Sequence, residues 1–189
     1  MAKRVSIVTP EFRAAFVHVF KPQDGIDGGA PKHSVVMLFD KTTDLSQMKA
    51  LAQQTAIDFF GGADKIPAKF KSPFRDGSEK AELEGYKDKI FVTASSNAEK
   101  FPAPGVVDAN KQPILDQTQV YSGCYMRAVV TCFGYNRAGN VGVSFGLNHV
   151  QKIRDGEPFS GRGKAEDAFD DSFKNADAPT ATADISKLF

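Results

Sequence analysis

The stretch Tyr121–Tyr135, YSGCYMRAVVTCFGY, decides the fold, because its side chains alternate in the way that predicts a β-strand. One face of this strand would carry four aromatic residues and an arginine, and the other would carry small and apolar residues. The first set is Tyr121, Gly123, Tyr125, Arg127, Val129, Thr131, Phe133 and Tyr135, and the second is Ser122, Cys124, Met126, Ala128, Val130, Cys132 and Gly134. A lone buried arginine is costly. We therefore expect the second set in the interior and the first set partly exposed.

Further strands surround this one in the sequence. Val141–Val150 follows across the five-residue loop NRAGN, Asn136–Asn140, and the pair predicts a hairpin. Near the start of the chain, FRAAFVHVF and KHSVVMLF predict strands at Phe12–Phe20 and Lys32–Phe39, joined by a long tip rich in glycine and proline. Another predicted strand covers Lys87–Ala94.

A single helix is predicted after Asp44, where the apolar residues change to a helical period. Asp44 and Gln47 have capping-box spacing, and Gly61-Gly62 supplies a stop. The residues on one face of this helix are Leu45, Met48, Ala52, Ala56 and Phe59. About five strands and one helix favour a small antiparallel barrel or an α+β sheet.

Length and charge predict one domain with an acidic extension. The 189 residues are 41% hydrophobic, which is enough for one core. Residues 166–189 carry a net charge of −4 and the remaining residues +5, although the whole chain is only +1. We expect a folded domain over residues 1–165 and a flexible acidic tail over residues 166–189, with disorder beyond roughly residue 170.

Neither membrane insertion nor cofactor chemistry is indicated. No run of about 18 apolar residues or signal peptide occurs, so we expect a soluble, unsecreted protein. His18, His33 and His149 are scattered without a metal-binding motif. GEPFSGRGK, residues 156–164, lacks the Lys-Ser/Thr of a phosphate loop, and no GxSxG elbow occurs. We predict no metal, no cofactor and no enzymatic activity.

Aromatic and basic residues are close together along the chain. There are 16 Phe and 4 Tyr but no Trp, and many of them stand within three positions of Lys or Arg. Bases stack on aromatic faces for about 1 to 3 kcal/mol each, while Lys and Arg neutralise phosphates, so this mixture suits single-stranded nucleic acid. Taken singly, some phenylalanines are better explained as core: Phe12, Phe16, Phe39, Phe59 and Phe145.

The candidate binding residues fall into three groups. Tyr121, Tyr125, Phe133 and Tyr135 are candidate stacking residues. The candidate phosphate contacts are Arg127, Arg137, Lys152 and Arg154, and a basic loop that could close over the strand contributes Lys69, Lys71, Phe74 and Arg75. If the aromatic set of the Tyr121–Tyr135 strand instead fills the core, binding must move to that loop.

Long segments of the sequence carry a family resemblance. The segment from Tyr121 to Phe169, together with PAKFKSPFRDGSEK from Pro67 and PGVVDANKQPIL from Pro104, resembles the bacteriophage single-stranded-DNA-binding protein family. The resemblance implies a mainly β OB-fold, a five-stranded antiparallel barrel, that binds single-stranded DNA without sequence preference in phage replication or recombination in the host cytoplasm. The predicted helix follows the second strand rather than the third, a layout that resembles podovirus replicative single-stranded-DNA-binding proteins.

The resemblance also bears on partners. An acidic tail that ends in an aromatic residue, here ADISKLF, resembles the segments with which such proteins hold replication or recombination partners, although Lys187 makes it less acidic than usual. A tail at −4 could also compete with DNA for the +5 body. A homodimer of this chain is also possible from the sequence. The alternatives are a non-enzymatic phage interaction or structural protein and a metal-dependent nuclease.

Overall fold

The computed structural model describes residues 5–25, 28–137 and 139–159. The chain divides into two units, Met1–Phe159 and Ser160–Phe189. The described residues end at Phe159, so the predicted tail and the predicted boundary at residue 165 lie outside them. The elements are β1 (Ser6–Val8), β2 (Phe12–Gln23), β3 (Lys32–Asp40), α1 (Ser46–Phe60), η2 (Ala63–Lys65), β4 (Arg75–Asp76), η3 (Gly77–Lys80), β5 (Lys89–Asn97), β6 (Gly105–Val107), η4 (Gln117–Gln119), β7 (Tyr125–Arg137) and β8 (Asn140–Arg154).

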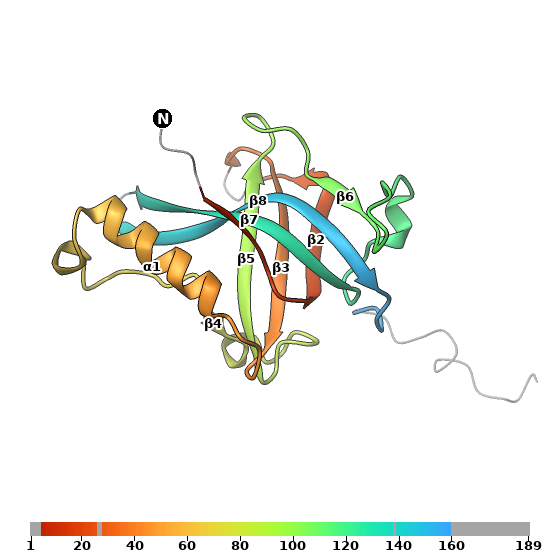
Figure 1. Ribbon diagram of the computed structural model, residues 1–189, viewed down its shortest axis with the longest axis horizontal. Coiled ribbons are helices and arrows are strands. Elements are labelled where there is room, and N and C mark those ends of the chain that lie inside the picture. Colours follow the sequence, from red (N-terminus) through yellow and green to blue (C-terminus); the bar gives the residue numbers. More distant parts are fainter. Residues whose placement is uncertain (1–4, 26–27, 138, 160–189) are drawn as a thin grey trace, which may run out of the picture. The chain divides into compact units, whose positions relative to one another are not determined.

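Five strands close into a ring in the order β2–β3–β5–β8–β7 and back to β2 (Figure 1). Every pairing in the ring is antiparallel except that of β5 with β8, where Ala94 pairs with Phe145. Three short strands lie outside the ring, with β1 on β7, β6 on β8 and β4 on β5. The ring is the predicted five-stranded OB barrel, and α1 follows its second strand as expected.

The barrel interior contains the small and apolar set of β7, which confirms the expected orientation of that strand. Cys124, Met126, Ala128, Val130 and Cys132 are buried, and both cysteines are free thiols. The aromatic set is half-exposed and Arg127 is exposed. The strand itself begins at Tyr125 rather than at Tyr121, because Gly123 adopts a φ of 114° in a turn that precedes it.

β2 departs from a simple alternation. A bulge between Ala15 and His18 places Phe16 at a φ of 46° and leaves its side chain 49% exposed. The expectation of a core role for Phe16 is therefore wrong, because the extra residue turns its side chain to the outside. Phe12, Phe39 and Phe145 are buried as expected.

α1 ends as predicted but begins differently. Gly61 closes the helix in the left-handed conformation, with its N–H donating to Ile57. At the start, Leu45 is the N-cap and makes no side-chain cap, while Asp44 accepts a bond from the Ser46 N–H, so the predicted capping box is absent. Phe59 is 47% exposed, contrary to expectation.

The end of α1 lies beside the β7–β8 hairpin, as Figure 1 shows. The Phe59 ring lies directly against Gly134, where an added methyl group would be 2.2 Å from the ring. The hairpin strands also extend further than the sequence predicts. Arg137 pairs with Asn140, so the predicted five-residue loop is wrong because cross-strand pairing continues into it.

Candidate nucleic-acid interface

One line of directly paired residues crosses the outside of the barrel over six strands. Residues that face each other across paired strands present their side chains on the same face. In this line, cations stand next to aromatic or aliphatic side chains. We call it the outer row, and from β4 to β8 it consists of Arg75, Phe91, Leu38, Arg13, Tyr125 and Arg154.

Cations cover the aromatic rings of the outer row. The Arg75 guanidinium lies 4.9 Å from the centre of the Phe91 ring, and the Lys80 ammonium lies 5.5 Å from the same ring. The Arg154 guanidinium lies 3.4 Å from the Tyr125 ring centre, with Arg13 at 5.9 Å. These cation–π contacts are attractive, because the face of an aromatic ring carries partial negative charge. The row therefore combines the two side-chain types that bind single-stranded nucleic acid.

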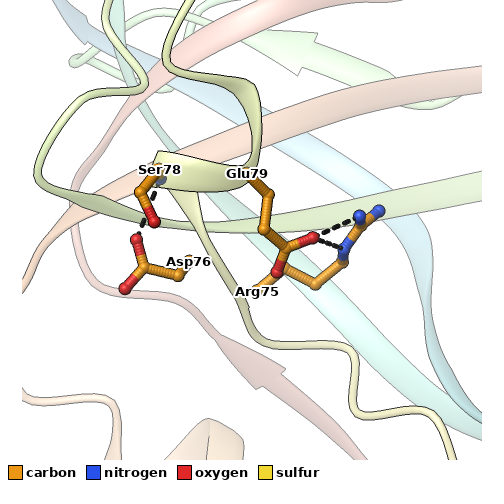
Figure 2. A network of polar contacts seen from close by, with 4 residues as sticks. All are labelled: Arg75, Asp76, Ser78 and Glu79. Atoms are coloured by element: carbon orange, nitrogen blue, oxygen red, sulfur yellow. Dashed lines mark hydrogen bonds and ion pairs between the residues drawn. The ribbon is translucent and has the colours of Figure 1, made fainter.

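Arg75 is fixed by its local sequence. Its Nε and Nη2 both donate to Glu79 Oε2, as Figure 2 shows. Beside it, Asp76 accepts the Ser78 N–H at 2.9 Å and begins η3. Bonds from the Ser78 backbone and side chain, and then Lys41, lower the pKa of Asp76 to about 2. The turn thus holds the Arg75 guanidinium over Phe91.

A small apolar cluster encloses this part of the outer row, and two residues of the row are buried in it. Its buried members are Ala15, Leu38, Tyr86 and Phe91, with Leu83, Val36 and Phe159 packed against them. Tyr86 is 1% exposed, its hydroxyl has no hydrogen-bond partner among the described residues, and burial raises its pKa to about 12. The exposed Phe16 ring meets Tyr86 edge-on at 6.5 Å.

A second group of predicted residues meets at the free end of the β7–β8 hairpin. Tyr135 pairs with Gly142, and a methyl group at Gly142 would lie 2.8 Å from the Tyr135 hydroxyl oxygen. An aromatic side chain laid across a cross-strand glycine covers the sheet surface. Lys71 joins this edge, because its N–H donates to Val141 at 2.9 Å. The tip group consists of Phe133, Tyr135, Arg137 and Lys71.

Tyr121 and Lys152 lie together beside the start of β7. The Tyr121 hydroxyl donates to Asp155 at 2.9 Å, and Lys152 pairs with the same carboxylate at 2.7 Å. The bond from Lys152 and then that from Tyr121 lower the pKa of Asp155. Lys152 also lies 5.5 Å from the Tyr121 ring centre. Arg154 is ion-paired with Glu11 at 2.8 Å.

Three predicted residues lie outside these groups. Arg127 donates to Gln151 at 2.6 Å and lines a cleft of about 380 Å³ near the start of α1. Phe74 points toward the core, with its ring edge-on to Phe145 at 5.8 Å. Lys69 is exposed on the loop before Lys71.

Sequence reasoning missed several outer-face residues. The arginine in FRAAFVHVF was a usable signal for Arg13, because apart from His18 every other residue of that stretch is apolar. Phe16, Tyr86 and Phe91 had no such signal, since a bulge and a covering loop decide which way they face. Among the described residues, no three His, Cys, Asp or Glu side chains gather to hold a metal, and no helix there could span a membrane.

Comparisons with known proteins identify relatives among phages. Residues 5–179 match the sequence model of the family described as Enterobacter phage Enc34, ssDNA-binding protein. Protein p50 of Acyrthosiphon pisum secondary endosymbiont phage 1 is 36% identical over an alignment of 172 residues, which covers 84% of this chain and 89% of that protein.

Two solved structures share the fold. The single-stranded DNA-binding protein from bacteriophage Enc34, in complex with ssDNA, aligns with a TM-score of 0.69 and 22% identity over 82% of this chain and 89% of that chain. The single-stranded DNA-binding protein gp2.5 of bacteriophage T7 aligns with a TM-score of 0.63 and 14% identity over 93% of this chain and 100% of that chain.

Proposed function

The chain belongs to the family of the Enterobacter phage Enc34 ssDNA-binding protein, and from this membership we propose that it binds single-stranded DNA without sequence preference. The process it serves is phage DNA replication or recombination inside the host cell. The outer row carries this proposal, because it lines up cations and aromatic rings across the barrel.

The location of the outer row supports the same function. OB-folds bind oligonucleotides over the face of their second and third strands and with the loop between the fourth and fifth. Those strands are β3 and β5 here, and they contribute Leu38 and Phe91 to the row. The loop between the fourth and fifth strands is the end of the β7–β8 hairpin, where the tip group lies. Leu38 and Phe91 are themselves buried, so on β3 and β5 a strand of DNA would touch the cations above them, Arg75 and Lys80. It would meet partly exposed rings at Tyr125 and in the tip group.

The roles proposed for individual residues follow their surroundings. Tyr125, Phe133 and Tyr135 stack bases, and Tyr121 supports this surface beside Lys152. Arg127, Arg137, Lys69, Lys71 and Arg75 contact phosphates. Lys152 and Arg154 contact phosphates when a phosphate replaces the carboxylate with which each is paired, Asp155 for Lys152 and Glu11 for Arg154. Phe74 anchors its loop by packing against Phe145.

The protein acts without catalysis or a cofactor, as a DNA-covering protein in the host cytoplasm. Residues 1–165 form the DNA-binding domain, and residues 166–189, with net charge −4, form an acidic segment that holds replication or recombination proteins. A homodimer is compatible with this role. A Mg²⁺-dependent nuclease is the enzyme alternative, and cleavage of a labelled single strand on addition of Mg²⁺ would establish it.

A polarisation titration tests the proposal. Fluorescent oligo-dT is titrated with the full chain at low salt, with duplex DNA and RNA of matched length as competitors. We expect saturable binding in the micromolar range or tighter, and weaker competition by the duplex because its bases cannot stack on the rings. Unchanged polarisation across the micromolar range would favour a phage interaction or structural protein instead.

A further inference from the structure

Residues Asp155–Phe159, which we call the strap, run from the end of β8 back over the turn before β7. The Tyr121 hydroxyl donates to Asp155 at 2.9 Å and accepts the Gly156 N–H at 3.3 Å. The Phe159 N–H donates to the Ser122 carbonyl at 2.8 Å, and Arg13 Nη2 donates to the Glu157 carbonyl at 2.7 Å. The strap is therefore fixed on the outer face beside the middle of the outer row.

The strap places the ring of Phe159 against Arg13. The Arg13 guanidinium carbon lies 4.2 Å from the ring centre. The ring also lies directly against Gly85, which has a φ of +83° and where an added methyl group would be 2.3 Å from the Phe159 Cζ atom. Glycine permits such close approach of a flat group to the backbone. We call the space that the Phe159 ring occupies the slot. Its walls are the Arg13 guanidinium and the Gly85 backbone, and the apolar cluster of Tyr86 and Phe91 lies beside it.

The slot has the chemistry of a base-stacking site. Nucleobases stack on arginine guanidinium planes as they do on aromatic rings. Arg13 stands next to Tyr125 in the outer row, so a base there would lie beside one of the rings proposed to bind DNA. Arg13 has a second anchor, because its Nε donates to the Gly123 carbonyl at 3.2 Å. The guanidinium therefore stays in position when its bond to the strap is broken, and Nη2 becomes available to a phosphate.

We infer that Arg13 and Gly85 form a nucleobase-stacking subsite that Phe159 occupies until single-stranded DNA displaces the strap. The inference rests on the proposed DNA-binding function and specifies one of its subsites. Phe159 then competes with DNA, because its ring and a base cannot both lie against the Arg13 guanidinium.

The first test measures oligo-dT affinity by polarisation for matched variants of the full chain. Phe159→Ala empties the slot, and we expect about three- to tenfold tighter binding, the range expected from loss of one cation–π contact. Phe101→Ala is the control, because it also removes a phenylalanine ring, which is 51% exposed and lies on a distant stretch of sequence. It should leave the affinity unchanged. Equal or weaker binding by Phe159→Ala would overturn the inference.

A second pair of variants tests the role of Arg13. Arg13→Lys keeps the positive charge and loses the planar guanidinium on which a base can stack. We expect Arg13→Lys to weaken oligo-dT binding by about fivefold or more, the range of one stacking contact. In its background, Phe159→Ala should give no gain. A full gain in the Arg13→Lys background would show that Phe159 does not act at Arg13.

Phe159→Trp distinguishes displacement from direct stacking. The chain contains no other Trp, so tryptophan emission would report on position 159 alone. Saturating oligo-dT should shift the emission to longer wavelength, because the ring moves from the slot into water. Quenching without that shift would mean that the residue itself stacks on a base, which contradicts the inference. If the wild-type chain does not bind oligo-dT, the proposed function fails as well, whereas wild-type binding without the Phe159→Ala gain removes only the inference.

Discussion

The Arg154 guanidinium lies 3.4 Å from the centre of the Tyr125 ring while its Nη2 donates to Glu11 at 2.8 Å. One guanidinium thus covers a ring and neutralises a carboxylate at the end of the outer row. In a DNA complex, a phosphate would replace Glu11 and a base would compete for the ring. Both side chains of the Arg154–Glu11 pair are on the surface, so either one can be replaced without disturbing the barrel.

Glu11→Gln should strengthen DNA binding. The change releases Arg154 from its carboxylate partner and removes a negative charge beside the outer row, so we expect about two- to fivefold tighter binding of oligo-dT at low salt. The gain should shrink as salt is added. Polarisation titrations at several salt concentrations measure it, and a gain that does not depend on salt would contradict the electrostatic explanation.

Removal of the arginine itself should act in the opposite direction. Arg154→Ala should weaken binding and lower the slope of log affinity against log salt by about 1, the share of one phosphate contact. Lys100→Ala provides the control, because Lys100 is exposed outside the outer row and the tip group. If both variants change the slope equally, Arg154 has no specific phosphate contact.

In the tip group, an aromatic residue and a lysine should affect DNA binding in different ways. Tyr135→Ala removes a ring that lies across Gly142, and we expect a loss of about 1 to 3 kcal/mol in oligo-dT binding, with little change in the salt slope. Lys71→Ala should mainly reduce the slope, by about 1. The same titrations distinguish these outcomes, and normal binding by both variants would remove the hairpin end from the interface.

Neighbouring residues on β7 should differ sharply in their effect on stability. Met126 is fully buried, so Met126→Ala should lower the free energy of unfolding by about 2 to 5 kcal/mol. Arg127 is exposed, and Arg127→Ala should change it by less than about 0.5 kcal/mol. Urea denaturation followed by circular dichroism measures both. Equal losses would mean that the strand faces are assigned wrongly.

Tyr86 predicts a loss of stability at high pH. Burial raises its pKa to about 12 from an ordinary value of 10.0, so folding favours the neutral hydroxyl. The contribution is complete below pH 10.0 and is lost as the pH rises toward about 12, because the unfolded chain ionises first. Tyr86→Phe should show a smaller fall in the free energy of unfolding between those values.

The neutral-pH behaviour of the same variant provides a check. The buried hydroxyl has no partner among the described residues, so its removal should leave the protein equally stable or more stable near pH 7. Urea denaturation at neutral and at alkaline pH tests both statements. A clear loss of stability at neutral pH would show that the hydroxyl makes a bond that holds the cluster together.

The elements that could be predicted from sequence are those set by local patterns. The period of two around Met126 identified the buried face of β7, and Gly61-Gly62 marked the end of α1. The bulge at Phe16 could not be read, because FRAAFVHVF alternates evenly and the bulge is set by pairing with β3. The parallel contact of Ala94 with Phe145 depends on closure of the whole barrel.

In the candidate site, too, the residues set by local patterns could be predicted and those set by long-range pairing could not. Aromatic residues on the outer face of β7 could be read from alternation, which named Tyr125, Phe133 and Tyr135. Arg13 and Phe91 join Tyr125 only through strand register across the barrel, and no local pattern encodes that register. Phe159 reaches Arg13 because the strap turns back over the barrel. The residues missed are those that long-range pairing brings together.

The most direct test of the central claim is an affinity panel on single-stranded DNA. The full chain is titrated against fluorescent oligonucleotides of equal length in dT, dA, dC and mixed sequence, at low and at moderate salt. We predict binding to every oligonucleotide, with affinities that fall steeply as salt rises, because rings and cations supply the binding energy without reading base edges. Binding to only one sequence, or unchanged polarisation with all of them at low salt, would contradict the account.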